Sequence, residues 1–226
     1  MQVLILGSGP NVVQAADWPR GPFDAIVAIN NAWRVRPDWD YHIHPSDFPK
    51  DRQPSTTTEG QRIVTFEDYV PANNRYGGIF YAGGTMAFTC GYWVLDALRP
   101  HVMAFLGCDM TYDAKTTHFY GQGTADPLRA DASLRSLEAK SARLQAMAAG
   151  QGCACVNLSD APSRLVFPRA TRDRLDVAAR TVDASRPLRM EAEAGYVVPS
   201  GKYWKEEDRF DPAVIDAIDA AWLKTV

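Results

Sequence analysis

Cysteine is scarce in this chain of 226 residues, which contains only four. Cys90, Cys108, Cys153 and Cys155 are too few for a disulfide scaffold. Cys153 and Cys155 also stand one residue closer than the CxxC spacing of redox and zinc motifs. We therefore expect reduced thiols and a cytoplasmic location.

An excess of positive charge is also missing. The 24 lysines and arginines face 27 aspartates and glutamates, which gives a formal net charge of -3. Clustered lysine and arginine hold a nucleic-acid backbone, so this balance excludes a broad nucleic-acid-binding surface and allows only a local basic patch.

Long hydrophobic runs are absent too. Only five residues lie between Met1 and Gly7, with no basic stretch before them, so we expect neither a signal peptide nor a transmembrane segment. Internal repeats and low-complexity tracts are likewise absent. The hydrophobic share of 46% is that of a globular protein with a substantial core, which excludes the fibrous and disordered classes.

Short apolar runs that stop at small or polar residues predict the strands of a mostly parallel sheet. They cover residues 3–6, 23–29, 39–44, 61–66 (an edge strand), 79–81, 102–106 and 153–158. Helical spacing covers residues 85–98, which Pro100 ends, and residues 133–149, with Gly150 as the C-cap. This alternation predicts an α/β three-layer sandwich.

The chain divides near residue 169. Residues 1–168 contain the predicted sheet and every candidate site residue, and they form one predicted domain. Residues 169–226 form a C-terminal extension that is weakly patterned up to residue 200. Asp211 and Pro212 open a final amphipathic helix, which continues through Trp222. We expect this helix to pack on the core or to form a subunit contact. A homo-oligomer is therefore one of the alternatives.

The turn after the first strand reads Gly7-Ser8-Gly9-Pro10-Asn11. Glycines allow a ligand to approach the backbone, and free N–H groups at a helix start favour phosphate. The turn matches neither GxGxxG nor the P-loop pattern, so neither an NAD-type oxidoreductase nor a P-loop nucleotide hydrolase is indicated. The alternative is a plain tight turn with Asn11 as a helix cap.

Polar residues also follow the second and third predicted strands. Asn30 and Asn31 offer amides that suit a base or a sugar, although such a pair also forms ordinary turns. His42 and His44 share one face of a strand, as two metal ligands would. No third ligand has suitable spacing, so we predict no metal site.

Reactive side chains are densest in a loop of about twenty residues after the 102–106 strand, and such long loops are often functional. His118 could act as a general base, because the imidazole pKa lies near neutrality. Tyr112, Tyr120 and Arg129 could stabilise a departing phosphate. The alternative is that the segment around His118 only pins the loop to the core.

The order of these motifs along residues 2–168 resembles the bacterial sialyltransferases that modify lipooligosaccharide, glycosyltransferase family 42. It also resembles the wider group with the domain of motility accessory factors and pterin pyrophosphokinases. The motifs are Gly7-Ser8-Gly9-Pro10-Asn11, Ile29-Asn30-Asn31, His44-Pro45-Ser46, Gly83-Gly84-Thr85, Gly107-Cys108-Asp109-Met110-Thr111-Tyr112 and His118-Phe119-Tyr120-Gly121.

The resemblance implies a Rossmann-like domain and a transferase that needs no metal or other cofactor. Its substrate would be a CMP-activated sugar, transferred with inversion to a glycan or lipid-linked acceptor. From the residues and the resemblance together, we expect the substrate-binding residues to be Gly7, Ser8, Gly9, Pro10, Asn11, Asn30, Asn31, His44, Ser46, Gly84, Thr85, Asp109, Gln122 and Arg129.

This chain departs from the family at several of these positions. Ser8 and His44 stand where the sialyltransferases have asparagines, and Gly84 replaces a serine. Gln122 occupies the position of their catalytic histidine, and a glutamine cannot serve as a base. We therefore expect His118, four residues upstream, to take that role.

Two alternatives stay open beside the glycosyltransferase. A magnesium-dependent pyrophosphokinase-like phosphoryl transferase would use Asp109, Asp113 and Asp126 to hold the metal. The second alternative is a nucleotide-binding module without catalysis, which Gln122 in the place of the catalytic histidine supports.

Overall fold

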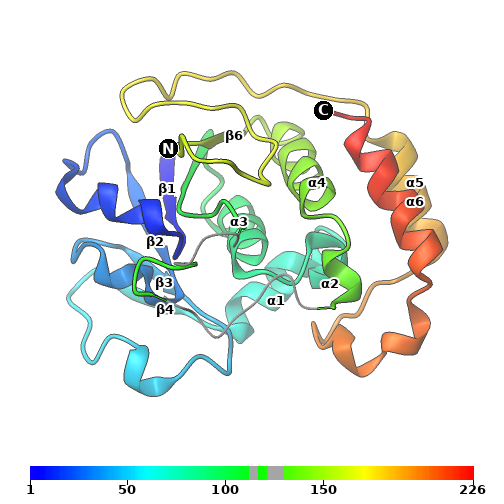
Figure 1. Cartoon of the computed structure of the whole chain (residues 1–226), viewed down its shortest axis with the longest axis horizontal. Coiled ribbons are helices and arrows are strands. Elements are labelled where there is room, and N and C mark those ends of the chain that lie inside the picture. Colours follow the sequence, from blue (N-terminus) through cyan, green and yellow to red (C-terminus); the bar gives the residue numbers. More distant parts are fainter. Residues whose placement is uncertain (112–116, 122–129) are drawn as a thin grey trace.

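A computed structural model describes residues 1–111, 117–121 and 130–226 of the chain. Within these residues six strands form one sheet in the order β4-β3-β2-β1-β5-β6, and every neighbouring pair is parallel (Figure 1). The strands are β1 (Gln2–Leu6), β2 (Ala25–Ile29), β3 (Tyr41–Ile43), β4 (Arg62–Val64), β5 (Val102–Leu106) and β6 (Ala154–Asn157). The predicted α/β class with a parallel, Rossmann-like sheet is confirmed.

Two hydrophobic clusters cover the two faces of this sheet. Alternate residues of β1 serve opposite faces: Val3 and Ile5 belong to one cluster, Leu4 and Leu6 to the other, and all four are fully buried. Burial on both faces therefore explains why residues 3–6 of β1 are all apolar.

The α-helices of the described residues cover the first face and flank it. They are α1 (Phe66–Asn74), α2 (Gly78–Ala82), α3 (Met86–Ala97), α4 (Leu137–Ala149), α5 (Ser185–Ala194) and α6 (Pro212–Leu223). Side-chain oxygens of Thr85, Ser136 and Asp211 accept backbone N–H hydrogen bonds at the starts of α3, α4 and α6, as N-cap residues do.

The second face is covered mainly by short 3₁₀ helices and irregular chain. Val12 of η1 (Pro10–Asp17), Ala32 of η2 (Asn30–Arg34) and Leu175 of the C-terminal extension are buried there. Among the described residues, four further 3₁₀ turns lie in loops: η3 (Lys50–Arg52), η4 (Ala132–Leu134), η5 (Tyr203–Lys205) and η6 (Glu207–Arg209).

The prediction of a strand at residues 79–81 was wrong. These residues lie in α2, which begins at Gly78 directly after Gly77, and both glycines have positive φ. α2 contacts α1, α3 and α4 on one face of the sheet. The apolar run therefore reflects a buried helical turn, which periodicity alone does not distinguish from a short strand.

The C-terminal extension packs tightly against α4. Lys140 and Arg143 of α4 are both buried; Lys140 pairs with Asp219 of α6 at 2.9 Å, and Arg143 pairs with Glu191 of α5 at 2.7 Å. The Trp222 indole, fully buried, donates a hydrogen bond to the same Glu191. The division at residue 169 stays a prediction. These contacts join the two predicted parts through buried side chains.

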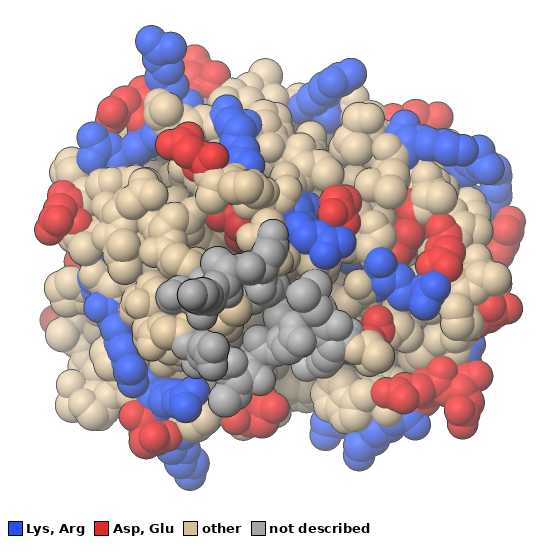
Figure 2. Space-filling model, in the orientation of Figure 1, with Lys and Arg blue, Asp and Glu red and all other residues tan. Residues whose placement is uncertain are grey.

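Positive and negative side chains are interspersed on the visible face of the molecule, apart from the atoms drawn in grey (Figure 2). Among the described residues, no helix has the length and apolar character needed to cross a membrane.

Candidate functional site

The turns after β1 and β5 meet at the point where the strand order reverses. β2, β3 and β4 lie on one side of β1, and β5 and β6 on the other. Leu6 pairs with both Ala28 and Leu106, so three strands end level with one another. In open parallel sheets, ligands bind beyond the carboxyl ends of the strands at such a reversal.

The backbones of these two turns are in direct contact. The Gly7 N–H donates to the Leu106 carbonyl and the Gly9 N–H to the Gly107 carbonyl, both at 2.8 Å. A Cβ on Gly7 would lie 2.3 Å from the Gly107 oxygen, so only glycine fits there. Two of the amides expected to bind phosphate are therefore already used within the protein.

A polar network joins the turns after β1, β5 and β6. Asn11 Nδ2 donates to Asp109 Oδ2 at 2.8 Å and to Ser159 Oγ at 2.6 Å, and Asn157 Nδ2 donates to Asp109 Oδ1 at 3.3 Å. The N-cap of η1 is Gly9, so Asn11 is not a helix cap. Asn157 and Ser159 were missed in the sequence, although both lie at the end of a predicted strand.

This network also occupies the aspartate that the magnesium alternative would use. Both carboxylate oxygens of Asp109 accept amide hydrogen bonds. No group of three histidine, cysteine, aspartate or glutamate side chains suited to a metal occurs within residues 1–111, 117–121 and 130–226. Asp113 and Asp126 lie outside the described residues.

Asn30 follows β2 in an unusual backbone conformation, with φ of 51°. Its carbonyl accepts a hydrogen bond from His42 Nε2 at 2.7 Å. His42 is fully buried, and burial lowers its pKa from 6.5 to about 4, so the imidazole is neutral at physiological pH. Asn31 is also buried, and its Oδ1 has no hydrogen-bond partner among the described residues.

His44 and Ser46 follow β3 at the same edge of the sheet. His44 Nδ1 donates to the Pro45 carbonyl at 2.9 Å, whereas Ser46 is exposed. The rings of His42 and His44 lie 5.1 Å apart, and both pack against Phe48. The two histidines thus share a face, as their spacing predicts, and form part of an aromatic cluster.

The His118 segment lies directly against the first turn. The Phe119 N–H donates to the Ser8 carbonyl at 3.0 Å. The backbones of His118 and Gly121 exchange two hydrogen bonds of 3.0 Å, which close a tight turn that carries Tyr120. Residues about 110 positions apart in the sequence therefore meet at one edge of the sheet.

The side chains of this segment have different surroundings. His118 is 7% exposed and Tyr120 38%, with their rings 5.1 Å apart. Burial lowers the His118 pKa, and Thr117 Oγ1 lies 2.8 Å from its Nδ1. Phe119 packs against the second hydrophobic cluster, so the segment is pinned to the core as well as placed at the turn. Tyr112, Gln122 and Arg129 lie outside the described residues.

Gly84 and Thr85 stand at the start of α3, where the C-terminal extension reaches them. The Gly84 N–H donates to Ser133 Oγ at 2.9 Å, and Thr85 caps the helix. A Cβ on Gly84 would lie 2.0 Å from the Tyr203 hydroxyl, which donates to Asp131 Oδ2 at 2.7 Å. Tyr203 and Ser133 thus fill this corner, and neither was predicted from the sequence.

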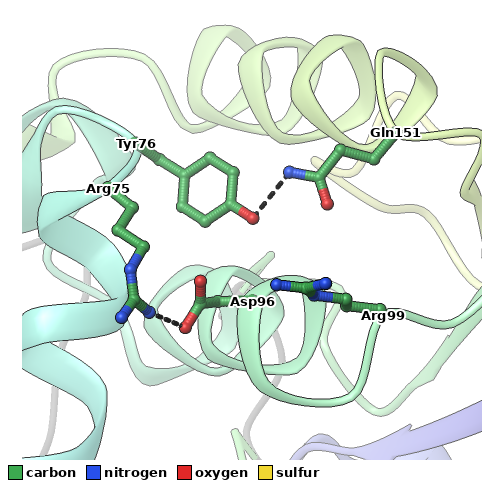
Figure 3. Close-up of a pocket in the computed structure, with 5 residues that line it drawn as sticks. All are labelled: Arg75, Tyr76, Asp96, Arg99 and Gln151. Carbon is green, nitrogen blue, oxygen red and sulfur yellow. Dashed lines mark hydrogen bonds and ion pairs between the residues drawn. The ribbon is translucent and has the colours of Figure 1, made fainter.

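A hollow of about 350 Å³ lies elsewhere, lined by Arg75, Tyr76, Asp96, Arg99 and Gln151 (Figure 3). These residues lie in or just beyond the last turns of α1, α3 and α4, and α3 and α4 lead into β5 and β6. The hollow is therefore at the amino edge of the sheet, away from the strand-end turns. Arg75 pairs with Asp96, and Gln151 Nε2 donates to the Tyr76 hydroxyl at 2.7 Å.

Comparison of the chain with protein-family models, with curated proteins and with solved structures gives no match. The candidate site is therefore defined by its own geometry. Its described part consists of the turns after β1, β2, β3, β5 and β6 together with residues 117–121.

Proposed function

We propose that the protein is a glycosyltransferase that uses a nucleotide-activated sugar and transfers it with inversion to an acceptor hydroxyl. The observation that carries this proposal is the hydrogen bond from the Phe119 N–H to the Ser8 carbonyl. It brings a histidine and a tyrosine against a glycine-rich turn at the reversal point of a parallel sheet, where nucleotides are commonly bound. The preference for a CMP-linked donor rests on the motif resemblance.

His118 is the proposed general base. Because burial lowers its pKa, the imidazole is neutral near pH 7, which is the state in which a histidine acts as a general base. In the proposed reaction the acceptor oxygen attacks the anomeric carbon while the bond from that carbon to the phosphate oxygen breaks. His118 takes the hydroxyl proton, and the nucleotide leaves with the bonding electrons.

Tyr120 is the proposed hydrogen-bond donor to the departing phosphate. Its exposed fraction of 38% leaves it accessible beside His118. Stabilising charge on the leaving group is commonly the larger contribution to such catalysis. The same role is predicted for Tyr112 and Arg129. Asn30, Asn31 and His44 are proposed to contact the nucleotide.

The magnesium-dependent alternative has less support. Asp109 would have to exchange the amide hydrogen bonds of Asn11 and Asn157 for a metal ion. Such an exchange would cost each amide its bond to a carboxylate and leave Asn11 with Ser159 and Asn157 with Ser163 as the side-chain acceptor.

Replacing His118 tests the proposal. In His118→Ala we expect the rate of transfer or hydrolysis of a CMP-sugar to fall by roughly 100-fold or more, because the proton acceptor is lost. The affinity for CMP should change little. A matched control is His101→Ala, since His101 is exposed and contacts the N-terminal amine. Rates within a few-fold of wild type would show that His118 is not the base.

Wild-type protein that binds CMP but turns over no CMP-sugar would instead identify a binding module without catalysis.

A further inference from the structure

Asn30 holds a left-handed backbone conformation at the end of β2, with φ of 51°. Glycine adopts this region freely, whereas other residues adopt it at a cost, and asparagine tolerates it better than most. Such conformations persist where surrounding contacts hold them, and they cluster at ligand sites. The carbonyl oxygen of Asn30 accepts a hydrogen bond of 2.7 Å from His42 Nε2–H.

The register of the sheet explains how His42 reaches this carbonyl. His42 of β3 pairs with Ala28 of β2, and side chains two residues apart on a strand lie on one face. The imidazole therefore extends along that face from Ala28 toward Asn30, at the carboxyl edge of the sheet.

The surroundings of His42 would suit an apolar side chain better. Its ring is fully buried among those of Trp33, Trp39, His44 and Phe48, at centroid distances of 5.1 to 6.5 Å. His42 Nδ1 has no hydrogen-bond partner among the described residues. A buried polar atom without a partner is unfavourable. The bond to Asn30 is the one polar contact, among the described residues, that an imidazole makes here.

Asn30 and Asn31 both leave an acceptor unused. The Oδ1 atoms of both side chains are buried and have no partner within residues 1–111, 117–121 and 130–226. Buried acceptors are normally satisfied, so unpaired ones at the edge of a candidate site indicate a ligand or ordered water with donor groups. The hydroxyls of a ribose are donors of this kind.

We propose that His42 is a positioning residue that holds Asn30 in its left-handed conformation and thereby directs the Asn30 amide toward the bound nucleotide. The inference rests on the proposed function for the identity of the ligand. His42 itself does not touch the ligand. Its effect passes through the carbonyl of Asn30.

Two substitutions of His42 separate the hydrogen bond from the packing. His42→Phe keeps an aromatic ring and removes the donor, and we expect the Kd for CMP to rise by about tenfold or more because the contact group is misplaced. His42→Gln restores an N–H donor and should recover part of the affinity. Trp39→Phe is the matched control, since it loosens the same aromatic cluster and leaves the bond intact. Because the hydrogen bond to Asn30 is kept in Trp39→Phe, we expect the Kd of this variant for CMP to stay within about twofold of wild type.

A double-mutant cycle shows whether His42 acts through Asn30. In Asn30→Gly the glycine adopts the left-handed backbone freely but lacks the side-chain amide, so this substitution should weaken CMP binding by itself. In that background His42→Phe should weaken binding no further. Losses that add fully in the double variant would overturn the proposal, as would wild-type affinity in His42→Phe.

The backbone of Asn30 provides a readout that does not need a ligand. In crystal structures of the full chain, we expect Asn30 to leave the left-handed region in His42→Phe and to return to it in His42→Gln. An unchanged Asn30 φ in His42→Phe would overturn the inference even if CMP binds. If no CMP binds to the wild type while Asn30 shifts as expected, the proposed function fails and the positioning of Asn30 by His42 stands.

Discussion

At the scale of single residues, the neutral state of His42 makes stability depend on pH. Burial lowers its pKa in the folded protein to about 4, below the ordinary value of 6.5. The unfolded chain therefore binds the proton more readily. Its contribution to stability is fully present above pH 6.5 and is lost as the pH falls toward 4.

The expected loss from His42 between pH 7.5 and 4 is about 3 kcal/mol in the free energy of unfolding. Urea unfolding of wild type and His42→Phe at both pH values measures it. Ionisable groups that both proteins contain contribute equally and cancel in the comparison. The decrease in the free energy of unfolding should therefore be smaller in His42→Phe by about 3 kcal/mol. Equal decreases in the two proteins would show that His42 is not held neutral by burial.

At the scale of elements, a buried ion pair joins α4 to α6. The Lys140 ammonium and the Asp219 carboxylate lie 2.9 Å apart, and both side chains are almost completely buried. Burial raises the Asp219 pKa, so removal from water opposes the charged state even beside Lys140. Breaking such a pair leaves a buried charge without its partner, whereas replacing both partners removes the problem.

Asp219→Ala should therefore lower the free energy of unfolding by about 3 to 5 kcal/mol. The double variant Lys140→Met/Asp219→Leu should be close to wild type or more stable. Asp216→Ala is the matched control, because it breaks the exposed pair between Arg135 and Asp216 of α6 and should have little measurable effect. Equal losses of stability in the single and double variants would show that an unpaired buried charge is not the cause of the loss.

Elements with clear apolar patterns were predicted well from the sequence. Runs that end at Gly7, Asn30 and Gly107 became β1, β2 and β5, since each is buried on both faces. Helix α5 was missed because Pro187 and Glu191 are its buried residues, and the Glu191 carboxylate is satisfied in the core by Arg143 and by the Trp222 indole. The buried face of α5 therefore lacks the regular apolar spacing of an amphipathic helix. This helix can be recognised only when the position of Arg143 is known.

At the scale of the whole molecule, the sequence predicted that the candidate residues lie at strand ends but not which strands are neighbours. The order of the sheet depends on pairings between distant segments, such as β1 with β5. The contact of Phe119 with Ser8 and that of Tyr203 with Gly84 follow from this order and from the path of the extension. Neither contact has a local sequence signal.

The whole fold also predicts the result of removing residues 169–226. The fragment 1–168 lacks Glu191 and Asp219, so Arg143 and Lys140 would lose their carboxylate partners. We expect this fragment to lack a cooperative thermal transition. Circular dichroism of the fragment and the full chain checks this expectation. A cooperative transition with native-like helix content would show that the first 168 residues fold as an independent domain.

The most direct test of the proposed function is calorimetric titration of the full chain with CMP, UMP, GMP and AMP, each with EDTA and with magnesium. We expect binding that favours CMP and is unchanged by EDTA. Binding that requires magnesium, or no binding of any of the four nucleotides, would contradict the proposed function.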